Sequence, residues 1–524
     1  MSTTDTTSGQ TMTKAEIDEL YPVPATKGTL PLPGPTRASA DVLIAKLKHN
    51  YKHHHIFFNA QNFHNHATHH LFAVYALGAP PELLEEVYET HSYQKPVVVS
   101  PEPITDNNFT QHLGDSAFYS GYLAYFSSYL LTHTATEALE RFVFSQEYIF
   151  VPELKENGAQ QPEMLSRLLA GVLHPMIHVG YGIEFGVPGQ TAEGLAQTAI
   201  HPPELIPTSV FSFSPPGVSG IVPAVENNKT LSKPKRPTFE FHQKVFKSPL
   251  LRPSALGLST GLLDQYETVL PRVRPVIFDY VREWSEKWLQ GAGENEAEER
   301  LKVMVEEVTW GNSLWFGVGG WGARGEDRVI NADFYNMHLV TSAIFLPTFL
   351  LPDSSTALSP PLPFAHRLLL LEAYLATCAT WHVSRGNPAI VIEDFFNSPS
   401  TAMYLTAPPM RNEVASEAKG KVDKVNFDAG RALRSGGSTW PRVVASTLLH
   451  DNEHLCKVTR ALGYSAETWG GREVGYYRSD DEGLDGVEKL DGTLFVRLAG
   501  LVTERLGWVA EGMETHNWDY DGYF

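Results

Sequence analysis

Long apolar segments without alternation of apolar and polar residues constrain the fold of this chain more than any other feature. The segments at 119–131, 163–185 and 366–384 show no strict two-residue period. Helical spacing of apolar residues dominates elsewhere in the chain as well. The sequence therefore predicts a mainly α fold, a compact and bundle-like arrangement of many helices with long loops and little β structure.

The predicted helices are bounded by residues that cap or break helices. Ser39 is a candidate N-cap, Gly78 a candidate C-terminal glycine, and Pro80 and Pro81 open the helix that follows. Pro175 predicts a kink, because proline removes a backbone donor and clashes with the preceding turn. We expect helices at 39–49, 62–77, 81–91, 119–131, 163–185, 256–270, 274–290, 294–316, 333–349, 366–384 and 440–462, and short strands around 474–478.

A single helical domain is predicted over residues 38–524, preceded by an N-terminal tail over residues 1–37. The tail begins with a polar, Ser/Thr-rich stretch and continues with a Pro/Gly-rich one, so we expect it to be disordered or extended. Residues 206–238 are rich in Pro, Ser and Asn and indicate a surface insertion, and residues 410–437 are polar and indicate a loop.

Charge and cysteine content argue against several classes of protein. The formal net charge of −19 repels phosphate backbones, so nucleic acid is not an expected partner. The two cysteines, Cys378 and Cys456, allow neither a disulfide framework nor a thiolate zinc site, which fits a reducing, cytoplasmic location. No segment approaches 18 consecutive apolar residues, and the start lacks the apolar stretch of a signal peptide, so no membrane association is expected. The oligomeric state is left open.

Histidine is the unusual residue type in this chain. There are 21 histidines, and eight of them fall between His49 and His70. In the run from His64 to His70, a helix would place His66 and His70, or His66 and His69, on one face. Two imidazoles at that spacing can reach one metal ion, as in other helical metal sites. The alternative is a polar, partly exposed helix face, which the local density of histidine disfavours.

Two further histidine motifs lie in apolar surroundings. His174 and His178 flank Pro175 within an apolar segment, and buried histidines require hydrogen-bond partners. His338 follows Asp333, a candidate N-cap, and lies among apolar residues of the predicted helix. Each of these histidines is either a metal ligand or a hydrogen-bonded residue of the core, and the local sequence does not decide between the two.

A lysine accompanies the last histidine motif. His454 and Lys457 are three positions apart and share one face of the predicted helix. A charged lysine would be repelled by a metal ion bound to His454. Lys457 therefore belongs beside a metal only as a neutral amine or as a carbamate formed with carbon dioxide, whose oxygens are ligands. Burial lowers the pKa of lysine and favours that chemistry. The alternative is an ordinary surface lysine.

One motif resembles a nucleotide-binding fingerprint without its context. Gly317 to Gly322 fits G-x-G-x-x-G, but the fingerprint requires a preceding strand and a helix that opens on it. The following residues, Gly325 to Arg328, are a poor helix start, and Trp321 is bulky for a pyrophosphate turn. We therefore expect no dinucleotide site here. The sequence offers neither another glycine-rich loop for FAD nor a G-x-S-x-G elbow for a hydrolase.

Taken together, these motifs resemble the questin oxidase-like family, which includes Baeyer–Villiger-type oxidases of aflatoxin-type polyketide pathways in filamentous fungi. The resemblance extends from about residue 40 to about residue 480 and follows the family's order, and the ordered set is more specific than any one motif. The residues that carry it are His64–Leu71 with Tyr75–Ala79, His174–His178 with Gly180, Tyr181 and Glu184, Asp333–Phe334 and Met337–His338 with Thr341–Ser342, Arg385–Pro388, and Glu453–His454 with Lys457 and Arg460–Leu462.

The resemblance implies oxidative cleavage of a quinone ring in an aromatic polyketide, an anthraquinone such as questin, to give a benzophenone. Dioxygen is the implied co-substrate. The family is associated with a non-haem iron, Fe(2+), held by four histidines and a carboxylated lysine, and NADPH is implied as an external reductant of the quinone. Carried onto this chain, the implied metal ligands are His66, His174, His338 and His454, with Lys457 as the carboxylated ligand.

The resemblance also assigns roles to residues beside these ligands. His70 and His178 either replace their helix neighbours as ligands or act as catalytic residues together with Tyr181. The aromatic and hydroxyl side chains of the same segments would supply an aromatic pocket and hydrogen bonds to the ligands.

Two other functions are retained as alternatives. The first is an NADPH-dependent or flavin-dependent Baeyer–Villiger monooxygenase without a metal, for which Gly317–Gly322 is the single candidate nucleotide site. A yellow purified protein would favour it. The second is a non-catalytic helical protein that binds polyketides and whose histidines are merely hydrogen-bonded. Metal analysis of the purified protein separates both alternatives from the iron enzyme.

Overall fold

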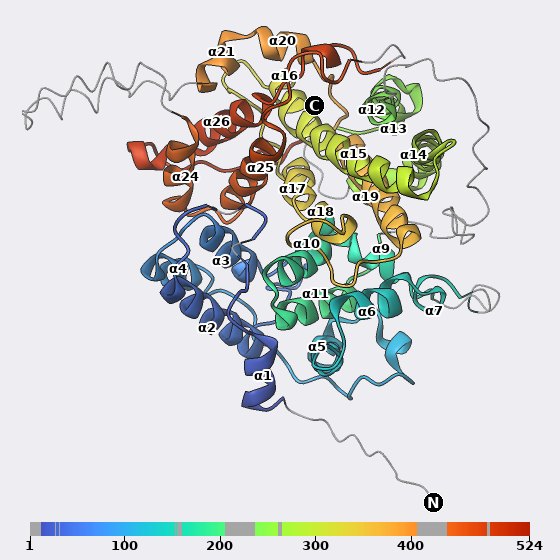
Figure 1. Cartoon of the computed structure of the whole chain (residues 1–524), viewed down its shortest axis with the longest axis vertical. Coiled ribbons are helices and arrows are strands. Elements are labelled where there is room, and N and C mark those ends of the chain that lie inside the picture. Colours follow the sequence, from blue (N-terminus) through green and yellow to red (C-terminus); the bar gives the residue numbers. More distant parts are fainter. Residues whose placement is uncertain are drawn as a thin grey trace, which may run out of the picture. The chain divides into compact units, whose positions relative to one another are not determined.

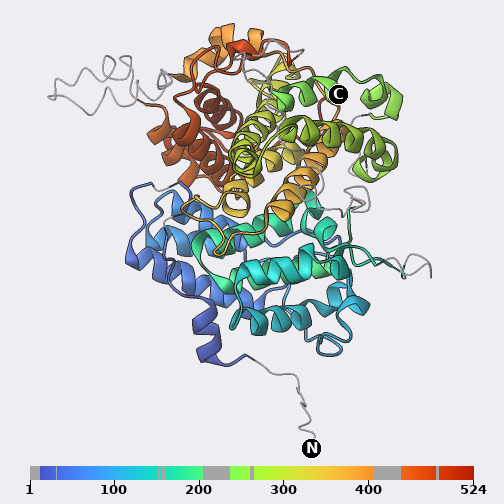
Figure 2. The same cartoon turned by 45° about the vertical axis from the view of Figure 1, so that its right-hand side comes forward.

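The computed structural model describes residues 12–524 apart from 27, 31, 152–153, 155–159, 205–235, 260–264, 406–437 and 479–482. Helices account for most of the described chain (Figures 1 and 2). The β pairing of the described residues consists of three isolated bridges. The predicted mainly α fold is confirmed. The strands expected around 474–478 are wrong, since residues 474–477 form turns. Among the described helices, none combines the length and apolar character needed to cross a bilayer.

Contacts along the chain divide it into two compact units, each assembled from several segments. The first unit consists of residues 1–226, 281–305 and 344–377, and the second of residues 227–280, 306–343 and 378–524. Three of the boundaries fall inside helices α14 (Gln265–Leu289), α15 (Glu294–Ser313) and α19 (Phe364–Ser384). The units are therefore not consecutive stretches of sequence. The expectation of one oxidase domain over residues 38–524 remains a prediction.

Short and medium helices build the first unit. They are α1 (Lys14–Leu20), α2 (Arg37–His53), α3 (Ala67–Ala76), α4 (Pro81–Glu89), η1 (Phe109–His112), η2 (Ser116–Phe118), α5 (Tyr119–Leu130), α6 (Ala135–Leu139), η3 (Glu140–Phe144), α7 (Gln146–Ile149), α9 (Met164–Leu168), α10 (Ala170–Phe185), α11 (Pro188–Ile200) and α18 (Leu346–Leu350). α10 packs against α11, α11 against α5, and α2 against α3 and α4. Gly194 permits the close approach of α11 to α10, because a Cβ there would lie 2.7 Å from the Val179 backbone nitrogen.

The N-terminal helices differ from the expected boundaries for local reasons. α1 lies within the predicted tail, and its N-terminus is capped by a capping box between Thr13 and Glu16. The side chain of Thr36, and not that of Ser39, caps α2, so this helix begins earlier than expected and continues to His53. The expected helix over 62–77 begins only at Ala67.

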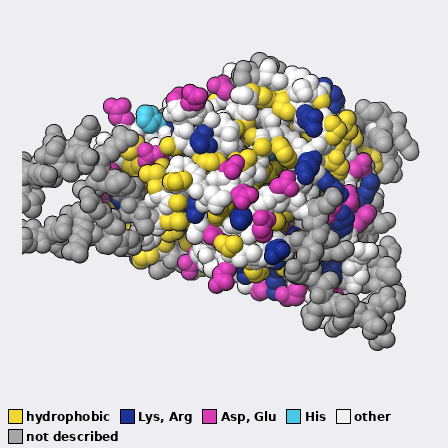
Figure 3. All heavy atoms as spheres, turned by 90° about the horizontal axis from the view of Figure 1, so that it is seen from above, with side chains coloured by type: hydrophobic (Ala, Val, Ile, Leu, Met, Phe, Trp, Pro, Cys, Tyr) yellow, Lys and Arg dark blue, Asp and Glu magenta, His cyan; other side chains and the backbone are white. Residues whose placement is uncertain are grey.

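The second unit contains the helices of the C-terminal half. They are α12 (Pro237–Lys247), η4 (Pro249–Leu251), α13 (Pro253–Leu256), η5 (Leu314–Val318), α16 (Gly319–Gly322), α17 (Phe334–Ala343), α20 (Ile392–Asn397), α21 (Pro399–Ala402), η6 (Met403–Leu405), α24 (Trp440–Leu448), α25 (Leu455–Trp469), η7 (Val487–Lys489), α26 (Leu494–Leu506) and η8 (Val509–Glu511). α25 packs against α17, α24 and α26. Acidic and basic side chains are interspersed on the face seen in Figure 3.

Two expected helix boundaries of the C-terminal half are wrong. Two helices were expected at 256–270 and 274–290. The structure instead has one continuous helix, α14, across the expected break, and it contains Pro271 and Pro275. The predicted helix at 440–462 is divided into α24 and α25. The surface insertion predicted at 206–238 lies outside the described residues up to 235, and the loop predicted at 410–437 lies outside them entirely.

Candidate functional site

His66 lies where the chain enters α3. Asn65 holds this point: its side-chain oxygen accepts the backbone N–H of Ala67 at 2.9 Å, and its amide donates to Asn50 Oδ1 at 2.9 Å. His66 is the N-cap residue of α3 and is buried. Its Nε2 lies 2.7 Å from Nε2 of His174. Two sequence-predicted ligands, more than 100 positions apart, therefore face one another through the same ring nitrogen.

A left-handed turn positions His174. Gly171, Val172 and Leu173 have φ of 55°, 55° and 68°, so α10 is interrupted at these residues and not at Pro175, where the kink was predicted. Such backbone is costly for branched residues and persists where the surrounding structure requires it. Gly171 also has no space for a side chain, since a Cβ would overlap the rings of His64 and His201. The turn brings the Gly171 carbonyl to Nδ1 of His174.

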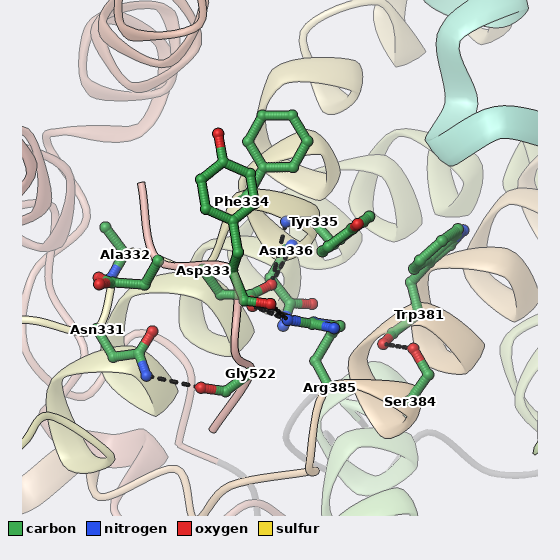
Figure 4. Close-up of polar contacts among 12 residues, drawn as sticks. Asn331, Ala332, Asp333, Phe334, Tyr335, Asn336, Trp381, Ser384, Arg385 and Gly522 are labelled. Carbon is green, nitrogen blue, oxygen red and sulfur yellow. Dashed lines mark hydrogen bonds and ion pairs between the residues drawn. The ribbon is translucent and has the colours of Figure 1, made fainter. Parts of the chain in front are cut away.

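Aspartate and arginine support the second predicted pair. Asp333 caps α17, because its Oδ1 accepts the backbone N–H of Asn336 at 2.8 Å and that of Tyr335 at 3.1 Å. Its Oδ2 accepts from Nε of Arg385 at 3.0 Å, in a buried ion pair (Figure 4). The predicted capping role of Asp333 is confirmed. Burial raises the pKa of Asp333, while Arg385 and the two backbone N–H groups oppose that rise.

His338 lies one turn into α17 and is fully buried. Its Nδ1 is 2.9 Å from the carbonyl oxygen of Phe334. The ring of His454 lies 5.1 Å from that of His338, and the ring of Phe334 packs against both at 5.0 and 4.9 Å. The ring of Phe334 also lies 4.9 Å from that of Tyr520.

His454 lies at the break between α24 and α25, where one helix was predicted. The side chain of Asn452 accepts the backbone N–H of His454 at 3.0 Å and the indole N–H of Trp518 at 2.9 Å. Side-chain bonds of this kind compete with the helical pattern and divide the helix. Nδ1 of His454 lies 3.4 Å from Oε1 of Glu453. His454 is the N-cap residue of α25. The Glu453 carboxylate contacts the Nδ1 side of its ring.

Lys457 lies one turn after His454 on α25 and is buried. Burial lowers the pKa of Lys457 to about 8, and the nearby Glu453 carboxylate opposes this change. Burial therefore favours the neutral amine, which is the state that reacts with carbon dioxide. Its assignment as a carboxylated ligand remains a prediction.

The described residues contain one group with the composition and spacing of a metal site. Its members are His66, His174, His338 and His454, all of them buried. Nδ1 of His174 and of His338 each faces a backbone carbonyl, which accepts the N–H and leaves the lone pair on Nε2. This is the arrangement by which proteins orient metal-binding imidazoles. The donor set therefore fits a transition metal that prefers nitrogen ligands.

The three predicted catalytic residues are buried near the first pair but outside this group. Nδ1 of His70 lies 3.1 Å from Nε2 of His91, which lines a cavity of about 700 Å³ beside α2 and α4. Nδ1 of His178 lies 3.0 Å from Nε2 of His69. The ring of Tyr181 is stacked 5.3 Å from that of His69. Catalytic roles for His70, His178 and Tyr181 remain predictions.

Sequence reasoning missed one buried acid, Glu193 on α11. Its Oε1 accepts from Tyr21 Oη at 2.5 Å and its Oε2 from Asn50 Nδ2 at 3.0 Å. Oε2 also lies 3.9 Å from Nε2 of His178. Burial raises the pKa of Glu193 to about 8. The available signal was an acidic residue among the small and apolar residues of 188–200.

Similarity to known proteins extends over most of the chain. A family model described as Questin oxidase-like matches residues 63–462. The Baeyer-Villiger monooxygenase AacuH of Aspergillus aculeatus is 26% identical over 313 residues, which cover 58% of this chain and 60% of that protein. The Questin oxidase of Aspergillus terreus is 24% identical over 425 residues, covering 79% and 78%. The Baeyer-Villiger oxidase AgnL3 of Paecilomyces divaricatus is 35% identical over 160 residues, covering 30% and 33%.

Proposed function

The chain belongs to the questin oxidase-like family and is an oxidoreductase, and from this premise we propose that it is a metal-dependent oxygenase acting on an aromatic polyketide. Its metal, a non-haem iron, would be held by His66, His174, His338 and His454. The observation that carries the proposal is the orientation of the imidazoles, since backbone carbonyls accept from Nδ1 of His174 and His338 and leave Nε2 as the ligand atom.

Iron bound to imidazole ligands would supply the activation of dioxygen. The chain's own residues hold and shield the ligands. The Gly171 turn and the Asp333 cap set the direction of His174 and His338. Stacked Phe72 and Tyr181, whose rings lie 5.3 Å apart, exclude water from the His69 side of the first pair.

Metal analysis of the full chain, purified without a histidine tag, tests this site. We expect about one equivalent of iron, and we expect His174→Ala and His338→Ala each to weaken iron binding by at least about 100-fold. His133→Ala is the matched control, since His133 is exposed. Iron content at the wild-type level in both variants, or none in the wild-type protein, would contradict the proposal.

The substrate that we propose is an anthraquinone, with questin as the first compound to test. The Questin oxidase relative supports this class. NADPH would act as an external reductant that converts the quinone to its hydroquinone. We expect a ring-opened benzophenone carboxylate by mass spectrometry, formed with dioxygen and faster with NADPH. An unchanged substrate after incubation with iron-loaded protein would reject questin and leave the metal site to be judged separately.

A Baeyer–Villiger outcome is the second candidate, because several relatives carry that name. Incubation under ¹⁸O₂ separates the two. A monooxygenase places one labelled oxygen atom in the product, whereas a dioxygenase places two. A nucleotide-binding version of this enzyme has little support, since Gly317–Gly322 lies in η5 and α16 and follows helix α15 instead of a strand.

A further inference from the structure

A short segment after η8, residues 518–523, contacts the groups that support both histidines of the second pair. We call this segment the strap. It belongs to the second unit, as do His338 and His454. The buried residues of the strap are Trp518, Asp519, Gly522 and Tyr523. The strap is therefore packed into the unit and does not lie on it as a surface loop.

Trp518 reaches His454 through a single side chain, that of Asn452. The indole N–H of Trp518 donates to Oδ1 of Asn452 at 2.9 Å, and the same oxygen accepts the backbone N–H of His454 at 3.0 Å. The two donors fix the orientation of the Asn452 amide, because a turned amide would present its NH₂ group to both of them. Trp518 therefore holds the backbone from which the His454 imidazole projects.

Asp519 attaches the strap to the residues at which α17 begins. Its backbone N–H donates to the carbonyl of Ala332 at 2.9 Å, and its carbonyl accepts the N–H of Phe334 at 2.8 Å. These two bonds form an isolated parallel bridge. The carboxylate accepts from Arg328 and Arg505 at 2.6 and 2.7 Å and from the N–H of Ala332 at 2.7 Å. Charge-assisted bonds of a buried carboxylate are strong, so α17 begins against a firmly attached strap.

Arg385 joins the strap to the cap of α17. Its Nε donates to Oδ2 of Asp333 at 3.0 Å, and its Nη2 donates to the carbonyl of Tyr520 (Figure 4). The carbonyl of Arg385 accepts the backbone N–H of Tyr523 at 2.7 Å. Because Asp333 caps the helix that carries His338, the strap supports this imidazole as well.

We propose that the strap is a positioning element of the second histidine pair and that its docking is coupled to metal binding by that pair. The inference rests on the proposed function. Trp518 and Asp519 are positioning residues, because they act through the backbone of His454 and through the first turn of α17. A bound metal ion would favour the docked strap, and the docked strap would raise metal affinity to the same extent, since coupling between two sites is reciprocal. Ligands that are already held in place lose less conformational freedom on binding.

Removal of one hydrogen bond tests the positioning role in the full chain. Trp518→Phe deletes the indole N–H and keeps an aromatic ring in its place, and we expect iron binding to weaken by at least about 10-fold. Trp508→Phe is the matched control, because Trp508 is also buried but donates to Oε2 of Glu504 at 2.7 Å. Its iron affinity should stay at the wild-type value. Equal iron affinities of the two variants would overturn the proposal.

Hydrogen exchange of the metal-free full chain, followed by mass spectrometry, tests the same role without any metal. In Trp518→Phe, the amides at the start of α25, including that of His454, should exchange about 10-fold faster than in the wild-type protein, which corresponds to the loss of one hydrogen bond. In Trp508→Phe they should exchange at the wild-type rate. Unchanged exchange at the start of α25 in Trp518→Phe would exclude the positioning role.

Addition of Fe(II) to the wild-type protein tests the coupling. We expect saturating Fe(II) to slow exchange of the strap amides, with the N–H groups of Asp519 and Tyr523 as reporters, because both donate to backbone carbonyls in the docked strap. In His454→Ala, Fe(II) should slow their exchange less. A strap that exchanges equally fast in iron-loaded and metal-free wild-type protein would overturn the coupling.

A second variant covers the case in which Trp518→Phe does not fold. Asp519→Asn removes the carboxylate charge from the strap, and we expect about 10-fold faster exchange of the Phe334 amide together with weaker iron binding. Glu511→Gln is the matched control, because it breaks the partly buried ion pair of Glu511 with Arg442 in the same unit. Wild-type exchange at the start of α17 in Asp519→Asn would count against the strap.

Failure of the proposed function is distinguishable from failure of the positioning role. A wild-type protein that binds no iron rejects the proposed function and the coupling together. The exchange rates of the metal-free variants decide in either case whether the strap positions the start of α17 and of α25.

Discussion

Glu193 and Asp333 are both fully buried carboxyl groups beside a predicted histidine pair, yet only Asp333 has a cation as its partner. Asp333 bonds to the Arg385 guanidinium and to two backbone N–H groups of α17. Glu193 accepts from a phenol and an amide and holds its proton at neutral pH. The same burial is therefore accompanied by an ion pair in the second unit and by a carboxyl group with a raised pKa in the first.

This difference suits Asp333 to a structural role and Glu193 to a chemical one. An ion pair whose members are both buried cannot change its charge without a large loss of stability, so it holds α17 and His338 in one position. A buried acid without a cation is disfavoured as a carboxylate, so Glu193 loses its proton only at a higher pH than a surface acid. The four predictions that follow test this contrast.

The largest effect is expected where the ion pair is broken. Asp333→Asn leaves the Arg385 guanidinium buried without its carboxylate and should lower the free energy of unfolding by about 3–5 kcal/mol. Asp41→Asn is the matched control, because the exposed Arg37–Asp41 pair contributes no more than about 1 kcal/mol. Urea unfolding of the two variants measures the difference. Equal losses would show that the buried pair is not a support.

The unpaired acid should reveal itself in the pH dependence of stability. Glu193 is protonated in both states below about 4.5, loses its proton in the unfolded chain above that pH, and keeps it in the folded protein up to about 8. The wild-type protein should therefore lose about 1.4 kcal/mol of stability per pH unit within this window relative to Glu193→Gln, or about 3 kcal/mol over two units. Unfolding curves of both proteins across the window measure it. Parallel pH profiles would show that the carboxyl group titrates normally.

Glycine at the turn before His174 should be necessary for both stability and metal binding. Gly171→Ala places a methyl group against the rings of His64 and His201 at a φ of 55°, and we expect a loss of about 1–3 kcal/mol together with weaker iron binding. Gly186→Ala is the matched control, because Gly186 has a similar φ of 66° but open space around it. Its loss should stay near about 1 kcal/mol with unchanged iron binding. Equal behaviour of the two variants would contradict the positional role of the turn.

The smallest effect is expected on iron binding at Lys457, because a lysine accompanies only the second histidine pair. If Lys457 is carboxylated, Lys457→Met should weaken iron binding by about 10-fold, and bicarbonate should aid reconstitution of the wild-type protein but not of the variant. Stability should not fall, since the change removes a buried amine. Iron titration of both proteins with and without bicarbonate measures this. Equal affinities would exclude the carbamate while leaving the four histidines in place.

Local signals in the sequence were sufficient for the helical class, for the histidine motifs and for the Asp333 cap. Each depends on residues within one or two turns, such as Asp333 and the N–H of Asn336. The kink was misplaced because Pro175 is a visible helix breaker, whereas the left-handed turn at Gly171–Leu173 is held by tertiary packing around His64 and His201. The division of 440–462 was missed because Asn452 is held by Trp518, a residue far along the chain.

The sequence by itself determined which residue types this protein has for its chemistry, because histidine spacing and helical periodicity are local and survive without knowledge of the fold. Only the tertiary structure decided what state those residues occupy. The protonation of Glu193 depends on its complete removal from water and on Tyr21, Asn50 and His178, which come from distant segments. The charge of Asp333 depends in the same way on Arg385. Burial and the identity of a distant partner set the free energy of the charged form, and neither can be predicted from the residues next to it in the sequence.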